Sequence, residues 1–227
     1  MQKLFAMLVI AVGWLAVVAL PAHAQPENGF GTETYSDGAT YEGEFRRGLR
    51  NGRGILTWPG GVRYEGDWRD GRRAGRGVLT WPDGIRYEGE FSEDKRTGRG
   101  IMIWANGDRY DGDFREDIRQ GRGVMIWING TRYDGEFTND KMHGRGTMSW
   151  AEGSLYSGEW RNGVREGQGM TTWPAGGRYD GQYVNGMPNG YGVLTLSGRD
   201  YRGQWRDGCL RVGNDWATAG VLKDTCR

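Results

Sequence analysis

Histidine, cysteine and uncompensated charge are all scarce in this chain of 227 residues, which has two histidines and two cysteines. Its 30 basic residues nearly balance its 29 acidic ones, which argues against generic polyanion binding and predicts no nucleic-acid partner. His143 has no cysteine or serine motif beside it, so it is not indicated as a catalytic base. Gly-x-Gly pairs occur without a following Gly-Lys-Ser/Thr, and turns explain them better than a phosphate loop does.

Long apolar runs are also missing, apart from one between Leu4 and Leu20. Lys3 precedes this run and Pro21, Ala22 and Ala24 follow it, which predicts a signal peptide over residues 1–24 with cleavage after Ala24. An uncleaved anchor is the alternative. Cleavage leaves 29 basic and 29 acidic residues and a soluble chain in the periplasm or outside the cell.

Both cysteines, Cys209 and Cys226, lie near the C-terminus of a chain that we expect in an oxidising compartment. We predict a disulfide between them that closes a loop of about 17 residues and contributes on the order of 3 kcal/mol. It would hold a C-terminal cap, residues 209–227, against an open sheet edge. Replacement of Cys209 by serine is expected to lower stability without abolishing binding.

What the chain does have is a repeat of 23 residues, which indicates a repeat architecture. Taking each repeat's first tyrosine as position 1, position 3 is glycine and position 5 is aromatic throughout. Positions 12 and 14 are glycine in seven repeats, and position 18 is tryptophan in six. Residues 25–40 fit the same frame as a half repeat, and the array spans residues 41–208. The repeats begin at Tyr41, Tyr64, Tyr87, Tyr110, Tyr133, Tyr156, Tyr179 and, after 22 residues, Tyr201.

Each repeat has the pattern of two short strands. In Tyr64-Glu65-Gly66-Asp67-Trp68 the alternation has period two, and Gly77-Val78-Leu79-Thr80-Trp81 is rich in β-branched and aromatic residues. Turn signals such as Asn106-Gly107 separate the repeats. We therefore predict an all-β fold: an elongated, single-layer antiparallel meander of about 15 strands, running about 70 Å as a twisted ribbon. Positions 1, 3, 5, 14, 16 and 18 are expected to share one face, with glycines accommodating rings.

The opening Tyr41-Glu42-Gly43-Glu44-Phe45, followed by Gly52-Arg53-Gly54, resembles the MORN repeat, and the similarity covers residues 29 to 208. This resemblance implies a β-meander module without chemistry of its own. Members of the family are linked to phospholipid contact or to dimerising scaffolds. The signal peptide and the lone array are similar to bacterial exported members, which makes cytoplasmic phosphoinositides poor ligand candidates.

Acidic pairs at positions 2 and 4, such as Glu42/Glu44 and Asp111/Asp113, could serve a glycosidase or bind calcium. However, they recur in every repeat through the fifth and are matched by arginines at positions 13 and 23, as in a charge ladder on a solvated face. We expect no catalytic residue, metal or cofactor. Asn129-Gly130-Thr131 matches a glycosylation sequon but also forms a hairpin turn.

The aromatic positions are the candidate binding face. The expected function is a non-catalytic scaffold that binds a protein partner or itself. Lipid headgroups or glycans are the alternative ligands, and a hydrolase that uses a groove carboxylate is a remote one. If the rings instead pack the sheet, function lies on its edges, turns or charged face. The candidate residues are Tyr41, Phe45, Trp58, Tyr64, Trp68, Trp81, Tyr87, Phe91, Trp104, Tyr110, Phe114, Trp127, Tyr133, Phe137, Trp150, Tyr156, Trp160, Trp173, Tyr179 and Tyr183.

Overall fold

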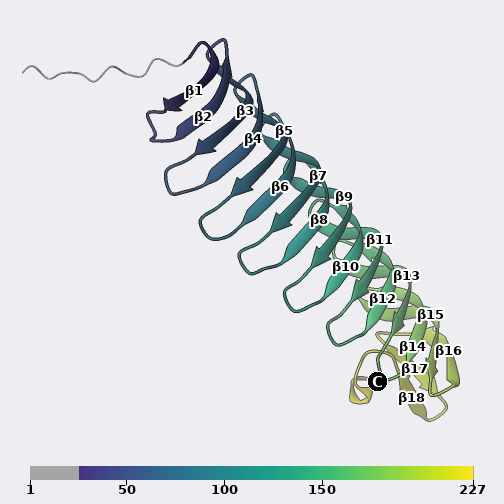
Figure 1. Ribbon diagram of the computed structural model, residues 1–227. Helices are drawn as coiled ribbons and strands as arrows, with labels where there is room; N and C mark the ends of the chain where they lie inside the picture. Colours follow the sequence, from purple (N-terminus) through teal and green to yellow (C-terminus); the bar gives the residue numbers. More distant parts are fainter. Residues whose placement is uncertain (1–25, 227) are drawn as a thin grey trace, which may run out of the picture.

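The computed structural model describes residues 26–226, which form one long antiparallel meander with the strands in sequence order (Figure 1). The predicted fold class is confirmed, with a sheet of sixteen strands and a separate small sheet of two. The predicted signal peptide lies outside the described residues. None of the helical structure within residues 26–226 is long and apolar enough to cross a membrane.

The two strands of each repeat have unequal lengths, usually seven and nine residues. The strands of the long sheet are β1 Asn28–Thr34, β2 Thr40–Arg46, β3 Leu49–Thr57, β4 Arg63–Arg69, β5 Arg72–Thr80, β6 Arg86–Ser92, β7 Lys95–Ile103, β8 Arg109–Arg115, β9 Ile118–Ile126, β10 Arg132–Thr138, β11 Lys141–Ser149, β12 Leu155–Arg161, β13 Val164–Thr172, β14 Arg178–Val184, β15 Met187–Leu196 and β16 Arg199–Trp205. The C-terminal elements are β17 Cys209–Val212, β18 Asp215–Thr218 and the 3-10 turn η1 Lys223–Thr225.

Two kinds of tight turn reverse the chain. Within a repeat, two successive residues take positive φ, as do Glu93 at 50° and Asp94 at 67°, which is the twist that suits a two-residue hairpin. Between repeats, the N–H of Trp81 donates to the carbonyl of Ile85 at 2.9 Å, and Gly84 takes a φ of 91°. Position 21 is glycine in each such loop because few other residues adopt this conformation.

The register places glycine beneath a tyrosine ring in repeat after repeat. Gly89 pairs with Gly100 on the neighbouring strand, and Tyr87 pairs with Met102. A Cβ at Gly100 would lie 2.4 Å from Oη of Tyr87. The expected sharing of one face by positions 1, 3, 14 and 16 is therefore what the sheet shows, and position 18 stands just beyond the strand.

A β-bulge after position 3 interrupts the pairing within each full repeat from β2 to β15. It frees the carbonyl of Glu90, which accepts a hydrogen bond from the Tyr87 hydroxyl at 3.0 Å. The Glu90 carboxylate in turn accepts from the backbone N–H of Arg99 at 3.3 Å. Gly98 beside it has a φ of 56°, and a Cβ there would lie 2.5 Å from Oε2 of Glu90. The tyrosine at position 1, the acid at position 4 and the glycine at position 12 thus stabilise the same bulge.

The C-terminal cap closes the last repeat. Leu210 of β17 lies over Gly203, where other repeats place their own tyrosine ring, and a Cβ at Gly203 would be 2.8 Å from Cδ1 of Leu210. Leu210, Ala217 and Ala219 extend the buried core. Cys209 and Cys226 form the predicted disulfide, with 5.8 Å between their Cα atoms.

Removal of this disulfide should destabilise the cap. Cys226→Ser tests this best, because Cys226 is partly exposed whereas Cys209 is buried and a serine there would also bury a hydroxyl. We expect a loss of about 3 kcal/mol in the free energy of unfolding, measured by urea denaturation, because the unfolded chain regains the entropy of an open loop. Reduced wild-type protein is the control and should match the variant. Equal stability of oxidised wild type and variant would contradict the prediction.

Candidate functional site

Fourteen of the twenty candidate rings form the core of the array. The seven tyrosines at position 1 from Tyr41 to Tyr179 are 0% exposed, and the rings at position 5 are no more than 5% exposed. Each tyrosine contacts the position-5 ring of its own repeat and of the next one edge-on, as Tyr87 contacts Phe91 and Phe114 with centroids 5.2 Å apart. These rings therefore pack the sheet, which is the alternative that the sequence left open, and do not form an exposed binding face. The buried rings are Tyr41, Phe45, Tyr64, Trp68, Tyr87, Phe91, Tyr110, Phe114, Tyr133, Phe137, Tyr156, Trp160, Tyr179 and Tyr183.

Burial also changes the acidity of these tyrosines. Loss of solvation raises the pKa of the Tyr41 phenol to about 12, because the phenolate would be held away from water. The same cause raises the pKa of Tyr87 and Tyr110 further. Arg96 opposes part of the effect at Tyr87. The core tyrosines are therefore neutral hydrogen-bond donors at ordinary pH.

A row of arginines at position 10 covers the core rings, and sequence reasoning missed it. The Arg96 guanidinium carbon lies 5.6 Å from the centroid of the Tyr87 ring, and its Nε lies 2.8 Å from Asp117 of the next repeat. Arg73 with Asp94 and Arg119 with Asp140 repeat this arrangement. Where position 8 of the next repeat is glycine, Arg50 and Arg165 donate to the glycine carbonyl instead. The available signal was therefore only the recurrence of arginine at position 10.

The six remaining candidates stay partly exposed. These tryptophans at position 18, which we call the Trp row, begin the loops between repeats and pack against the core on one side. Within residues 26–226 no indole N–H of the row donates a hydrogen bond to protein, and none is among the buried polar atoms without a partner, so these donors face solvent. The Trp row consists of Trp58, Trp81, Trp104, Trp127, Trp150 and Trp173.

Clefts open beside the Trp row near both of its ends. One, of about 450 Å³, lies between Trp58 and Trp81 over Val62 and Leu79. Arg73, Arg96 and Asp117 form its other wall, and the two arginines are already paired with aspartates. A similar cleft lies between Tyr35 and Trp58, and a smaller one lies between Trp150 and Trp173 beside the cap. The arrangement offers apolar floors, aromatic edges and walls without net charge.

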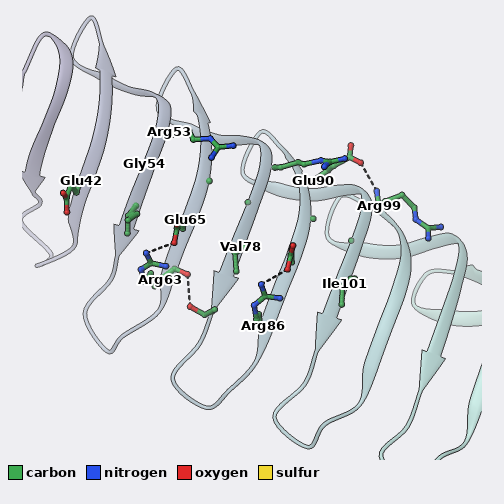
Figure 2. A pocket seen from close by; sticks show the side chains of 18 of the residues that line it. Glu42, Arg53, Gly54, Arg63, Glu65, Val78, Arg86, Glu90, Arg99 and Ile101 are labelled. Atoms are coloured by element: carbon green, nitrogen blue, oxygen red, sulfur yellow. Dashed lines mark hydrogen bonds and ion pairs between the residues drawn. The ribbon is translucent and has the colours of Figure 1, made fainter.

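A second surface is the charged groove, whose lining side chains Figure 2 shows. Along each strand these residues alternate with the buried rings, so the groove lies on the other face of the sheet. Its volume is about 860 Å³ from β1 to β8, and a further hollow of about 530 Å³ continues from Arg122 to Asp180. Paired glycines and the aliphatic residues Ile55, Val78 and Ile101 form its floor. The sequence signal for this groove was the recurrence of charged residues at positions 2, 13 and 23.

Most carboxylates of the charged groove already have partners. At position 2, Glu88 pairs with Arg86 of its own strand at 2.6 Å, and Asp134 pairs with Arg132 at 2.6 Å. At position 4 the carboxylates accept backbone N–H groups at the bulge, as Glu90 does. Among the described residues, Arg76, Arg122 and Arg145 at position 13 have no ion-pair partner. The charge ladder therefore has a structural role, with arginines left available to ligands.

The polar groups that could hold a metal ion were the remaining candidates for a site in the described residues. Residues 26–226 contain no group of three or more histidine, cysteine, aspartate or glutamate side chains placed to hold a metal ion. The Nδ1 atom of His143 is buried and lacks a hydrogen-bond partner. Asn129-Gly130-Thr131 forms a turn in which the Thr131 N–H donates to Oδ1 of Asn129 at 2.9 Å.

Two solved structures show a distant likeness to this chain. The SAS-4 TCP domain of Drosophila melanogaster, solved with a proline-rich motif of Ana2, is 11% identical with a TM-score of 0.43, over 90% of this chain and 99% of that one. The TCP10 domain of Danio rerio CPAP with a STIL peptide is 12% identical with a TM-score of 0.42, over 74% and 70%. A search of curated proteins finds no match.

The repeats themselves match a family model along most of the chain. The model of the MORN repeat matches eight consecutive segments, residues 27–40, 41–63, 64–86, 87–109, 110–132, 133–155, 156–178 and 179–199. These segments cover the half repeat at β1 and the seven repeats whose tyrosines and glycines build the core. This chain belongs to the MORN repeat family.

Proposed function

We propose that this chain is a non-catalytic scaffold that acts outside the cytoplasm and binds a protein partner along its Trp row. The observation that carries the proposal is the repetition of one partly exposed tryptophan per repeat, with clefts beside the row near both of its ends. Tryptophan is enriched where protein interfaces derive most of their binding energy, since it combines large apolar area with a hydrogen-bond donor. Tryptophans repeated along one continuous sheet favour a partner that touches several of them at once.

The experiment places a photo-crosslinking amino acid at Trp81 in the full chain, expressed in the cells that produce it. Arg76 in the charged groove is the control position on the opposite face of the same repeat. We expect a discrete protein adduct from position 81 and none from position 76. Sedimentation velocity then tells whether the partner is a second copy. Adducts from position 76 alone would place the interface in the groove.

A ligand with phosphate or acidic sugar groups is the second candidate, because Arg76, Arg122 and Arg145 lack ion-pair partners among the described residues. Such a phospholipid headgroup or glycan would lie in the charged groove. Co-sedimentation with vesicles that contain an anionic lipid, or with cell-wall glycan, should then fall with added salt and with Arg122→Gln. Binding of this kind, together with no protein adduct at position 81, would replace the scaffold proposal.

A further inference from the structure

We infer that the Trp row is a track for a proline-rich segment in the polyproline II conformation. This inference rests on the proposed function and names the chemistry of the partner. The row repeats once per two strands, which corresponds to about 9.6 Å along the sheet. A polyproline II helix advances about 3.1 Å per residue with three residues per turn, or about 9.3 Å per turn. Every third residue of such a segment therefore meets successive tryptophans in the same way.

The hydrogen-bonding chemistry of the row fits that backbone. A polyproline II segment makes no internal hydrogen bonds and presents its carbonyl oxygens to the surroundings. The Trp row presents indole N–H donors that have no acceptor within residues 26–226. The indole N–H groups are thus spaced by about one turn of the peptide and can each meet one of its carbonyl oxygens. Because proline has no backbone N–H, a segment rich in proline would leave few N–H groups unpaired.

The clefts between the tryptophans fit proline or another apolar side chain. The cleft between Trp58 and Trp81 has Val62 and Leu79 at its floor. Its arginines already pair with Asp94 and Asp117, so the walls have no net charge to attract a charged residue. Grooves lined by aromatic residues are a recurring means of binding proline-rich segments, because the preformed helix loses little entropy on docking.

The mismatch of the two periods limits the length of the ligand. The offset between the peptide and the tryptophans grows by about 0.3 Å per repeat, and the twist of the sheet adds to it. Three to four repeats, which correspond to roughly nine to twelve peptide residues, remain in register. The stretch from Trp58 to Trp127 has the required length. Arg119 stacks on the ring of Trp104 at 5.6 Å, so Trp58 and Trp81 are better positions for substitution.

The test titrates the chain that begins at residue 25 with three synthetic 12-residue peptides. Isothermal titration calorimetry measures each affinity. The peptide (Leu-Pro-Pro)4 has the period of the track. The peptide (Leu-Pro-Pro-Pro)3 keeps the stiff helix but changes the period to four, and (Leu-Gly-Gly)4 keeps the period but removes the stiffness. We expect the first to bind at least about tenfold more tightly than either control, since it alone combines a stiff helix with the period of the tryptophans.

The variant Trp81→Phe isolates the indole N–H, because it keeps a ring packed against the core. Its affinity for (Leu-Pro-Pro)4 should fall roughly threefold to tenfold, as expected for one lost hydrogen bond, with an unchanged melting temperature. The control Trp216→Phe removes an indole N–H in β18, outside the row, and should leave binding unchanged. Combining Trp58→Phe with Trp81→Phe should deepen the loss.

Several results would overturn the inference. They are equal affinity for the period-three and period-four peptides, no binding of any peptide at millimolar concentration, or a Trp81→Phe variant that binds as the wild type does. If these occur while position 81 still crosslinks to a protein, the scaffold function holds and the polyproline II partner is wrong. If position 81 gives no adduct either, both proposals fail.

Discussion

Replacement of Gly100 by alanine should destabilise the array by roughly 3–5 kcal/mol, the sum of overpacking and a disturbed buried hydrogen bond. The new methyl group would lie 2.4 Å from Oη and 2.6 Å from Cε2 of Tyr87. That ring cannot withdraw, because Phe91 and Phe114 contact it on both sides and its hydroxyl donates to the carbonyl of Glu90. Urea denaturation followed by circular dichroism measures the change.

The control is Gly84→Ala in a loop between repeats. Nothing lies within 4 Å of its added Cβ, so only the strain of a φ of 91° remains, and we expect about 1 kcal/mol. Gly100 has no positive φ, so the difference between the two variants reports the contact with the ring. If Gly100→Ala is as mild as Gly84→Ala, the packing of tyrosine on glycine is not the main source of stability.

Alkaline solution should unfold the protein in one steep transition. Burial raises the pKa of the seven position-1 tyrosines from Tyr41 to Tyr179, to about 12 for Tyr41 and beyond that for the others, whereas a tyrosine in the unfolded chain titrates near 10. The folded state thus favours the protonated phenol. The protonated phenols contribute fully to stability below about pH 10. This contribution is lost as pH rises toward the pKa of the tyrosines in the folded state. Seven such tyrosines act together.

Simultaneous recording of phenolate absorbance and circular dichroism during a pH titration tests this. We expect most of the absorbance change to coincide with the loss of the circular dichroism signal, because the seven core tyrosines ionise only when the sheet opens. Return to neutral pH serves as the control for chemical damage, and no free cysteine among the described residues is available to exchange disulfides. Ionisation of all the tyrosines near pH 10 with an intact sheet would show that the core rings are accessible.

Much of the fold could be predicted from the sequence because its determinants are local. Turn residues at fixed intervals, such as Asp83-Gly84 and Asn106-Gly107, define where strands end. Glycine at positions 3 and 14 indicates which residues face each other across neighbouring strands. The bulge could not be predicted in the same way, since its pairings depend on which carbonyl remains free after the strands align. The reason for an acid at position 4 therefore appeared only with the structure.

The candidate site was predictable only in part. In a single-layer sheet, whether a ring is buried depends on its contacts with the next repeat, and the pattern within one repeat does not contain that information. Tyr87 is covered because Phe114 and Arg96 reach it from neighbouring elements. Trp81 follows the strand rather than lying within it, so it keeps an exposed edge. Sequence periodicity identified both as aromatic but could not distinguish them.

The order of the strands has a mechanical consequence. Each strand of the long sheet pairs only with its neighbours in sequence, so β1 and β16 lie at opposite ends (Figure 1). Tension applied between the two ends would peel hairpins away one after another instead of shearing many hydrogen bonds at once. Each repeat of 23 residues would release up to about 80 Å of chain. A tether built in this way would lengthen in uniform steps under load and shorten again when the load is removed.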